Sequence, residues 1–151
     1  MTRRLITTAL AGLATLAVLA APSGATGTSS PPSPSLAVFE GRTIDLSQGW
    51  GEAQACLVFT QARTVECFRD RAGLRARENA LARSSALTTL AACSSPLRLY
   101  ADIYYGGREL ALYDRGYWQN LSTWSFDNQL SSYKVGACGV RLAENSNGGG
   151  A

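Results

Sequence analysis

Four cysteines limit the folds open to this chain more than any other feature. They lie in the body of the chain, which contains no histidine among its 151 residues: Cys56, Cys67, Cys93 and Cys138. Without histidine and without C-x-x-C spacing, a zinc site is a poor interpretation. An even number of cysteines in a small exported chain predicts disulfides, for which three pairings exist on paper.

The first 25 residues have the pattern of a secretory signal peptide. Arg3 and Arg4 precede an apolar run from Leu5 to Ala21, and small residues follow up to Ala25, where we expect cleavage. The alternative is a retained anchor, because this run reaches the lower length limit for crossing a bilayer. The run is rich in Ala, Thr and Gly, so we favour the signal. We therefore predict a secreted, extracellular protein with no membrane attachment after cleavage.

Removal of the signal leaves a chain of almost balanced charge. Two of the 14 basic residues lie in the signal, so 12 basic residues (14 minus 2) face 11 acidic ones. The single lysine is Lys134. This balance argues against nucleic acid or an anionic membrane as partner.

The composition divides the chain into five parts. The signal peptide (1–25) is followed by a flexible linker rich in Ser, Thr, Pro and Gly (26–36). A hairpin and a helix (37–92) then precede a β-module (93–142), and a glycine-rich tail follows (143–151). The predicted fold class is mainly β with one helix (α+β).

Residues 55–68 predict a β-hairpin closed by one of the disulfides. They form two runs of β-branched and aromatic residues on either side of a short turn. Placing Cys56 opposite Cys67 leaves a two-residue turn and aligns the two runs. This pairing is the one we favour, and Cys93–Cys138 would then join the two ends of the module that follows.

Residues 69–92 favour a helix, because Ala, Leu, Arg and Glu dominate and no proline interrupts them. At helical spacing the apolar residues Ala72, Ala76, Ala80, Leu87 and Leu90 fall near one face, and Arg71, Arg75 and Glu78 near the opposite one. We interpret the charged face as solvated, with one Arg–Glu pair at helical spacing. An anionic partner for the five arginines of this stretch is the less favoured alternative.

The C-terminal third has the composition of an antiparallel β-module. All six tyrosines lie between Tyr100 and Tyr133. Three stretches, 97–103, 108–113 and 131–140, have strand composition and are separated by glycine-rich turn signals.

The order of aromatic and glycine residues in this module is distinctive. The stretch LYADIYYGGREL, followed by WQNLSTWSFDNQLSSYKV, resembles a Greek-key motif of the βγ-crystallin family. The resemblance implies a folded hairpin with aromatics at Tyr100 and Tyr105, a glycine at Gly107, and Ser132 at the start of the last strand. Among secreted bacterial proteins it is similar to peptidase inhibitors of the Streptomyces metalloproteinase inhibitor type.

Residues 127–132 resemble the calcium signature of the microbial branch of that family. The pattern is two Asp/Asn, two variable residues, Ser/Thr and then Ser. Calcium prefers six to eight oxygen ligands, and this loop can supply about three or four. The resemblance implies ligands at Asp127, Asn128, the Gln129 carbonyl and Ser131, with calcium as a cofactor and the remaining ligands coming from a paired motif.

Only one such motif is recognisable before the glycine-rich end of the chain. A single Greek key would expose an apolar sheet face and unpaired edges. We weigh three explanations: a truncated two-motif protein, a homodimer that completes the half domain, and coverage by the hairpin and helix of 37–92. The third is the simplest.

Two functions of different classes remain. The first is a secreted peptidase inhibitor or binding module, in which a disulfide-braced loop is held extended in the cleft of an extracellular peptidase. The second is a calcium-stabilised extracellular structural or interaction domain. An enzyme is not expected, because acid–base chemistry is poor without histidine. The carboxylates Asp102, Glu109 and Asp114 fall where hairpin surface charges fall.

A band of aromatic residues offers a further candidate surface. It comprises Tyr104, Tyr105, Tyr117, Trp118 and Trp124. Greek-key modules bury many such residues, so we expect most of them in the core. A sugar- or protein-binding surface is the alternative.

Overall fold

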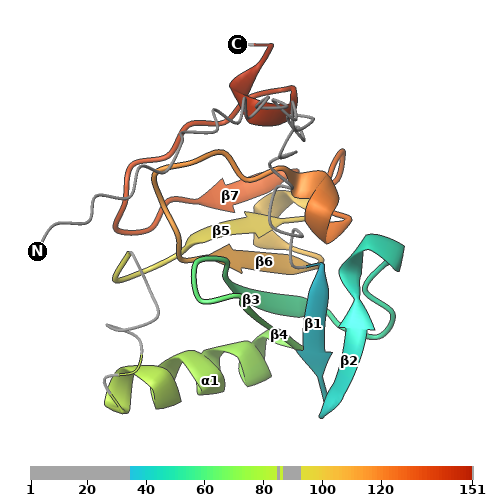
Figure 1. Ribbon diagram of the computed structural model, residues 1–151, viewed down its shortest axis with the longest axis vertical. Coiled ribbons are helices and arrows are strands. Elements are labelled where there is room, and N and C mark those ends of the chain that lie inside the picture. The colour runs from blue at the N-terminus through green and yellow to red at the C-terminus, as the bar shows by residue number, and fades with distance from the viewer. Residues whose placement is uncertain (1–34, 85, 87–92, 151) are drawn as a thin grey trace, which may run out of the picture. The chain divides into compact units, whose positions relative to one another are not determined.

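The computed structural model describes residues 35–84, 86 and 93–150, in which seven strands form one sheet against one α-helix (Figure 1). The predicted mainly β chain with one helix is confirmed. The strands are β1 (Leu36–Phe39), β2 (Arg42–Asp45), β3 (Ala55–Phe59), β4 (Thr64–Phe68), β5 (Leu97–Tyr100), β6 (Glu109–Leu112) and β7 (Ser132–Lys134). Short 3₁₀ turns are η1 (Leu46–Gln48), η2 (Ile103–Tyr105), η3 (Leu121–Trp124) and η4 (Ser146–Gly148).

The sheet has the order β2-β1-β4-β3-β6-β5-β7. The pairs β1/β2, β3/β4, β5/β6 and β5/β7 are antiparallel, whereas β1/β4 and β3/β6 are parallel. The hairpin β3–β4 therefore does not cover a face of the C-terminal module. It pairs with β6 and continues the sheet sideways, which removes one open edge of that module.

The β3–β4 hairpin has the predicted register. Cys56 lies directly opposite Cys67. The two cysteines are 11 residues apart in sequence and form a disulfide. The turn is closed by a hydrogen bond of 3.0 Å from the Arg63 amide to the Thr60 carbonyl. Arg63 has a φ of 53°, so a non-glycine residue takes the left-handed conformation that this turn requires.

Helix α1 spans Arg71–Arg83. Asp70 caps its N-terminus, because the Asp70 side chain accepts a hydrogen bond of 2.8 Å from the Gly73 amide. The expected helix extended to residue 92, but 85 and 87–92, which include Leu87 and Leu90, lie outside the described residues. The predicted orientation is wrong. The face turned inward carries Leu74, Glu78 and Leu81, while Ala72 and Ala76 are exposed.

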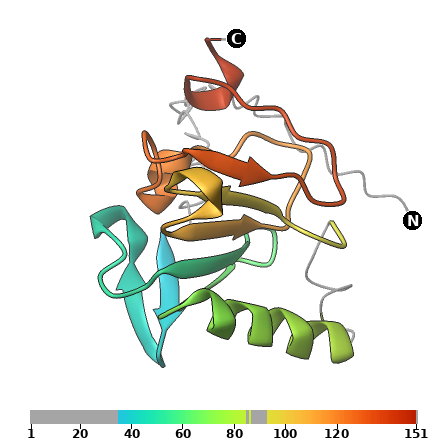
Figure 2. The ribbon, with the colours of Figure 1, turned by 180° about the vertical axis from the view of Figure 1, so that it is seen from behind.

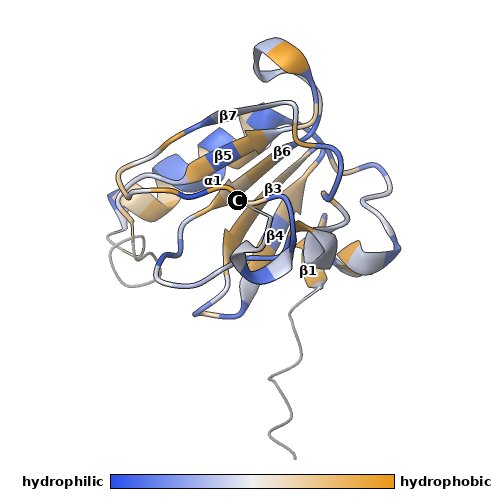
Figure 3. Ribbon diagram, turned by 90° about the horizontal axis from the view of Figure 1, so that it is seen from above, coloured by the Kyte–Doolittle hydropathy of each residue, from blue (hydrophilic) through white to orange (hydrophobic). Residues whose placement is uncertain are grey.

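Two apolar cores lie on the two faces of the sheet. On the α1 side, Leu57 and Phe59 of β3 pack with Leu74 and Leu81 of the helix. The other face carries the larger core, in which the Cys56–Cys67 disulfide packs with Trp50, Trp124 and Phe126. Figure 3 shows apolar residues along the central strands. The central strands are nearly continuous apolar runs, as expected for strands whose side chains are buried on both faces of the sheet.

The C-terminal strands are shorter than expected. β5, β6 and β7 cover only parts of the three predicted stretches, and residues 135–142 contain no strand. The expected strand to Val140 is therefore wrong over most of its length. β7 returns to pair with β5, giving the order β6-β5-β7, and the long connection before it holds only η3. A Greek key has four strands, and the described residues of 93–142 form three, so the Greek-key topology stays a prediction.

Candidate functional site

The hairpin between β5 and β6 is a compact, internally bonded loop. The Asp102 amide donates to the Gly106 carbonyl at 3.1 Å, and the Gly106 amide donates to the Ile103 carbonyl at 3.1 Å. Tyr104 and Tyr105 both have positive φ, of 57° and 62°. The loop is thus folded back on itself, and its backbone does not take the extended form expected for a loop in a protease cleft.

Gly107 ends this loop in a conformation that suits glycine. Its φ is +66°, and a Cβ built on it would lie 2.7 Å from the carboxyl carbon of Asp102. Both the left-handed backbone and the close approach of the Asp102 side chain favour the absence of a side chain here.

Ser132 holds the loop from the last strand. Its hydroxyl donates to the Asp102 carbonyl at 2.6 Å and accepts from the Tyr105 amide at 3.0 Å. The Tyr105 ring packs edge-on against the ring of Tyr100, with 5.5 Å between centroids, and the Lys134 ammonium lies 4.1 Å from the centroid of the Tyr105 ring. The structure therefore brings together Tyr100, Tyr105, Gly107 and Ser132, the four residues that the motif singled out.

The loop presents bulky side chains to solvent. Tyr104 is 89% exposed and Ile103 is 64% exposed. We call Ile103, Tyr104 and Tyr105 the hairpin surface. Clusters of exposed large apolar side chains of this kind mark interaction sites in soluble proteins.

Most of the aromatic band is not in the core, contrary to expectation. Of its five members only Trp124 is buried, while Tyr104, Tyr105, Tyr117 and Trp118 are all exposed. The core positions are taken by other residues, such as Trp50 and Phe126. Tyr104 and Tyr105 lie in η2 with positive φ, and Tyr117 and Trp118 lie on the connection between β6 and β7 outside any strand. None of the four therefore stands on a face of the sheet, where its ring would turn into the core.

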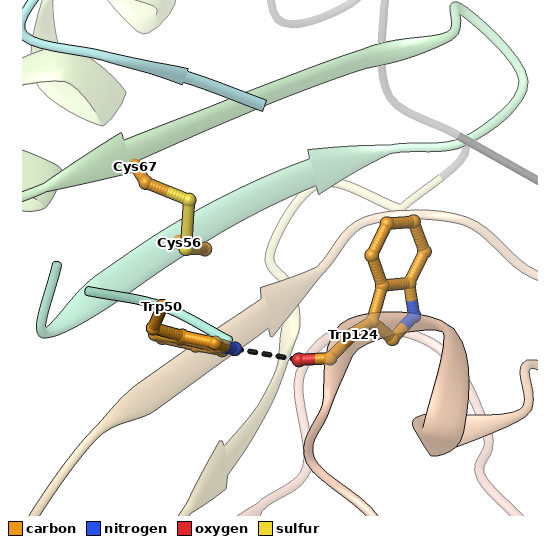
Figure 4. The surroundings of a disulfide bond; sticks show 4 residues. All are labelled: Trp50, Cys56, Cys67 and Trp124. Carbon is orange, nitrogen blue, oxygen red and sulfur yellow. Dashed lines mark hydrogen bonds between the residues drawn. A yellow bond between two sulfur atoms is a disulfide. The ribbon is translucent and has the colours of Figure 1, made fainter. Parts of the chain in front are cut away.

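Trp50 and Trp124 fix that connection to the N-terminal part of the sheet. The Trp50 indole nitrogen donates a hydrogen bond to the Trp124 carbonyl, beside the Cys56–Cys67 disulfide (Figure 4). The second disulfide, Cys93–Cys138, joins residues 45 apart and brackets both the hairpin and the long connection. Both cysteine pairs are those that the residue pattern favoured.

The residues of the predicted calcium loop are divided between two places. Gln129 and Ser131 line a shallow hollow together with Asp102, Asp127 lines a different cavity, and Asn128 lines both. The Ser131 hydroxyl lies 3.4 Å from the Gln129 carbonyl oxygen and donates to it.

A positive charge occupies the same hollow. The Arg108 guanidinium lines it and donates a hydrogen bond to the Gln129 side-chain oxygen. Among the described residues, Asp102 is the only acidic residue that lines this hollow. Calcium needs six to eight oxygen donors and is repelled by a guanidinium, so this donor set does not fit the ion.

A buried ionic network between α1 and the sheet was missed by sequence reasoning. Glu109 is fully buried, and its carboxylate lies 2.7 Å from both the Arg75 and the Arg98 guanidinium. The expectation that Glu109 is a surface charge is therefore wrong. Strand β6 carries its side chain toward α1, where arginines of the helix and of β5 surround it.

Glu78 extends this network from the helix. Arg98 donates to it at 2.9 Å, and Arg75 lies 3.1 Å away, so the expected Arg–Glu pair is present. Burial raises the pKa of the Glu78 carboxyl, although the Tyr113 hydroxyl, which donates to it at 2.9 Å, and Arg75 oppose that rise. The expected solvated face is in fact the helix–sheet interface. Among the described groups every member has a charged or hydroxyl partner, which is the signature of a structural network.

Neither a metal cluster nor a membrane helix is found in the described part of the chain. Residues 35–84, 86 and 93–150 contain no group of three or more His, Cys, Asp or Glu side chains arranged to hold a metal ion. Within the same residues no helix has the length and apolar content needed to cross a membrane. Two disulfides fit an oxidising compartment. Comparison with known proteins yields no match to a protein family, to a curated protein or to a solved structure.

Proposed function

We propose that the mature chain is a secreted, disulfide-braced, βγ-crystallin-like protein that binds and inhibits an extracellular peptidase through the loop Asp102–Gly107. The observation that carries this proposal is the exposure of Tyr104, 89%, on a loop that is fastened from three sides. Ser132 bonds its backbone, Tyr100 supports Tyr105, and Gly107 allows its sharp end.

A fastened loop is suited to tight binding because little conformational entropy is lost when it docks. Ordering a rotamer-rich side chain or a loop at an interface costs about 0.5–1.5 kcal/mol per side chain. Tyr and Trp anchors that enter a partner's pocket carry most of the binding energy in protein complexes. Tyr104 and Ile103 supply such an anchor next to a loop backbone that is already ordered.

The backbone conformation changes the inhibitory mechanism from the one expected from sequence. Positive φ at Tyr104 and Tyr105 is incompatible with an extended, substrate-like strand in the cleft. The loop acts instead as a plug, whose aromatic tip fills an apolar pocket of the peptidase and blocks access of the substrate.

The second disulfide protects this arrangement against cleavage. Cys93 and Cys138 lie on either side of the loop in sequence, so a cut within Asp102–Gly107 leaves the two pieces covalently joined. Strands β5 and β6 on either side are also paired directly. A nicked inhibitor would thus keep its shape and reclose or remain bound.

The test is inhibition of extracellular peptidases by the purified mature protein. A thermolysin-like metalloprotease is assayed with a peptide substrate over a range of inhibitor concentrations, together with a serine peptidase for comparison. We expect inhibition of the metalloprotease, and a loss of about 30-fold or more in Tyr104→Ala, which corresponds to a hot-spot contribution of ~2 kcal/mol.

The matched control is Tyr117→Ala. Tyr117 is also exposed, at 45%, but it lies on the connection between β6 and β7 and outside the hairpin surface. This variant should inhibit as the parent does. Absence of inhibition by the parent protein, or equal inhibition by Tyr104→Ala, would show that the proposal is wrong.

A further inference from the structure

A cavity of about 700 Å³ lies on the face of the sheet opposite α1. Its floor is formed by Leu97 and Leu99 of β5 and Leu112 of β6, which belong to or pack against the core on that face. Its walls are the connection 114–122 and the C-terminal segment 138–147. This volume lies within the range of about 300–1,000 Å³ that is typical of small-molecule sites. No residue of the hairpin surface lines it.

The C-terminal wall is fastened to the rest of the cavity at both ends. At one end, Cys138 is bonded to Cys93, and both cysteines line the cavity. At the other end, the Asn147 amide donates to the Asn120 side-chain oxygen at 3.1 Å. Gly148 packs so closely on the Trp118 ring that a Cβ there would lie 2.3 Å from it. Figures 1 and 2 show the C-terminal segment beyond β7 and at the opposite end of the molecule from α1.

The walls are dominated by neutral groups that both donate and accept hydrogen bonds. They include the side chains of Gln119, Asn120, Asn128, Asn145 and Asn147, with the hydroxyls of Ser122 and Ser146. The amides offer an NH₂ donor and a carbonyl acceptor each. Such a set matches a ligand with many hydroxyl groups, which also donate and accept.

The charges of the lining nearly cancel and give an ionic ligand little advantage. Three carboxylates, Asp114, Asp127 and Glu144, stand against two guanidiniums, Arg115 and Arg141, and none of the lining residues is a lysine. An ionic ligand of either sign would therefore meet groups of its own charge beside groups of the opposite charge. A purely apolar ligand would remove water from the amides without replacing their hydrogen bonds, which is costly.

Aromatic rings complete the site. Tyr117 and Trp118 line the cavity and are 45% and 43% exposed. Burial raises the pKa of Tyr117 above its ordinary value, and the nearby Asp114 carboxylate adds to that rise. Rings of this kind present a large apolar surface beside a polar edge. A pyranose ring has the complementary character, with an apolar C–H face and a rim of hydroxyls.

We propose that this cavity binds a neutral oligosaccharide, with sugar rings against Tyr117 and Trp118 and hydroxyls bonded to the asparagines and glutamine of its walls. The site is separate from the hairpin surface and does not depend on peptidase inhibition. Through it the secreted protein would attach to a polysaccharide while the hairpin surface remains available.

The test is titration of the isotope-labelled mature protein with three neutral trisaccharides: cellotriose, maltotriose and N-acetylated chitotriose. Two-dimensional NMR separates the indole signals of the three tryptophans. We expect the Trp118 indole and the backbone amides of 116–120 to shift with at least one sugar, while Trp50 and Trp124, each only 2% exposed, do not shift.

Two variants and one control make the outcome specific. Trp118→Leu removes the stacking ring and should weaken binding at least tenfold, followed through the backbone amides. Asn145→Ala removes a wall amide, leaves Trp118 in place, and should weaken binding about threefold, which guards against misfolding of the first variant. Tyr104 lies outside the cavity, so Tyr104→Ala should bind the sugars with the affinity of the parent protein.

The proposal is overturned by any of three results. These are the absence of shifts with all three sugars up to about 10 mM, a concentration at which millimolar affinities are detected; unchanged affinity in both variants; and shifts of the same signals by phosphate or a fatty acid in place of the sugars.

Discussion

The hydroxyl of Ser132 donates a hydrogen bond of 2.6 Å to the backbone carbonyl of Asp102, a residue 30 positions earlier in the chain. The same hydroxyl oxygen accepts from the Tyr105 amide. One small side chain on the last strand thus satisfies a donor and an acceptor of the β5–β6 hairpin. Without it, both backbone groups would depend on solvent.

Ser132→Ala should therefore loosen the hairpin without removing any residue of its surface. Loss of two hydrogen bonds costs about 1–2 kcal/mol of unfolding free energy, measured by urea denaturation. Hydrogen exchange at the Tyr105 amide should accelerate, and peptidase inhibition should weaken because Tyr104 is less well ordered. Ser131→Ala is the matched control, since that hydroxyl bonds only its own loop. Equal exchange rates in the two variants would contradict the role of Ser132.

Glu109→Ala should be far more damaging than its exposed counterpart Glu40→Ala. Glu109 is fully buried between Arg71, Arg75 and Arg98. Its removal takes away the carboxylate that these three arginines share and leaves Glu78 as the counter-charge of Arg75 and Arg98, a loss of about 3 kcal/mol. Glu40 pairs with Arg69 at the surface, where water and salt screen the two charges and the pair contributes little to stability. Chemical denaturation of both variants compares the two losses, and similar values would mean that the network is not a structural bridge between α1 and the sheet.

The sequence predicted the pairing within one hairpin, but it did not predict the burial of Glu109. The Cys56–Cys67 register followed from two apolar runs on either side of a short turn, a relationship contained within 55–68. The burial of Glu109 depends on Arg75, 34 residues away, and on the parallel pairing of β6 with β3, which no local pattern announces. Its position at the start of ELAL, directly before the apolar residues 110–112, was the available signal.

The first two strands were missed for a different reason. Residue 36 was assigned to a linker, but β1 begins there, and β1 and β2 form a hairpin. Glu40 and Gly41 make its turn with φ values of 49° and 74°, and an X-Gly pair between alternating strands is a hairpin signal. The composition of the preceding Ser/Pro stretch obscured it. Within the site, the four motif residues could be predicted, whereas the exposure of Tyr104 depends on how the loop folds back.

The pKa of Glu78 predicts a stability that decreases as the pH rises above about 4.5. Burial raises the pKa of this carboxyl above its ordinary value of 4.5, so the folded protein holds the proton more tightly than the unfolded chain. Unfolding then releases a proton in the window between 4.5 and the raised pKa, and the free energy of unfolding falls with rising pH there. Glu78→Gln should flatten this slope while keeping an oxygen for Arg98 and Tyr113.

A second group acts in the opposite sense and in a separate window. The hydrogen bond from Arg69 lowers the pKa of Glu40 below 4.5, so its contribution is lost as the pH falls below that value. Urea unfolding at a series of pH values from 3 to 8 resolves the two effects. An unchanged slope above pH 4.5 in Glu78→Gln would exclude Glu78 as the titrating group.

The two disulfides should differ in what they protect. Cys56 and Cys67 are 11 residues apart, and replacing both by alanine should cost about 3 kcal/mol, whereas the 45-residue loop of Cys93–Cys138 should cost about 4 kcal/mol. Removal of the second pair also frees one end of the cavity's C-terminal wall. We therefore expect that variant to lose oligosaccharide affinity and to fall apart after a cut in the hairpin, as judged by non-reducing gels. If the two variants behave alike in both assays, the bracket formed by Cys93 and Cys138 has no special role.

Gly107→Ala should separate two sources of strain in the hairpin. The first is the backbone, because φ of +66° costs a non-glycine residue about 1–2 kcal/mol. The second is steric, because the new Cβ would lie 2.7 Å from the carboxyl carbon of Asp102. Gly116→Ala is the matched control, since Gly116 also has positive φ, +91°, but no atom within 4 Å of the new Cβ. Urea denaturation should therefore show a larger loss of unfolding free energy for Gly107→Ala than for Gly116→Ala. Combining Gly107→Ala with Asp102→Gly should recover the steric part and leave the backbone part, and equal losses in the single and double variants would mean that the Asp102 carboxylate does not crowd this turn.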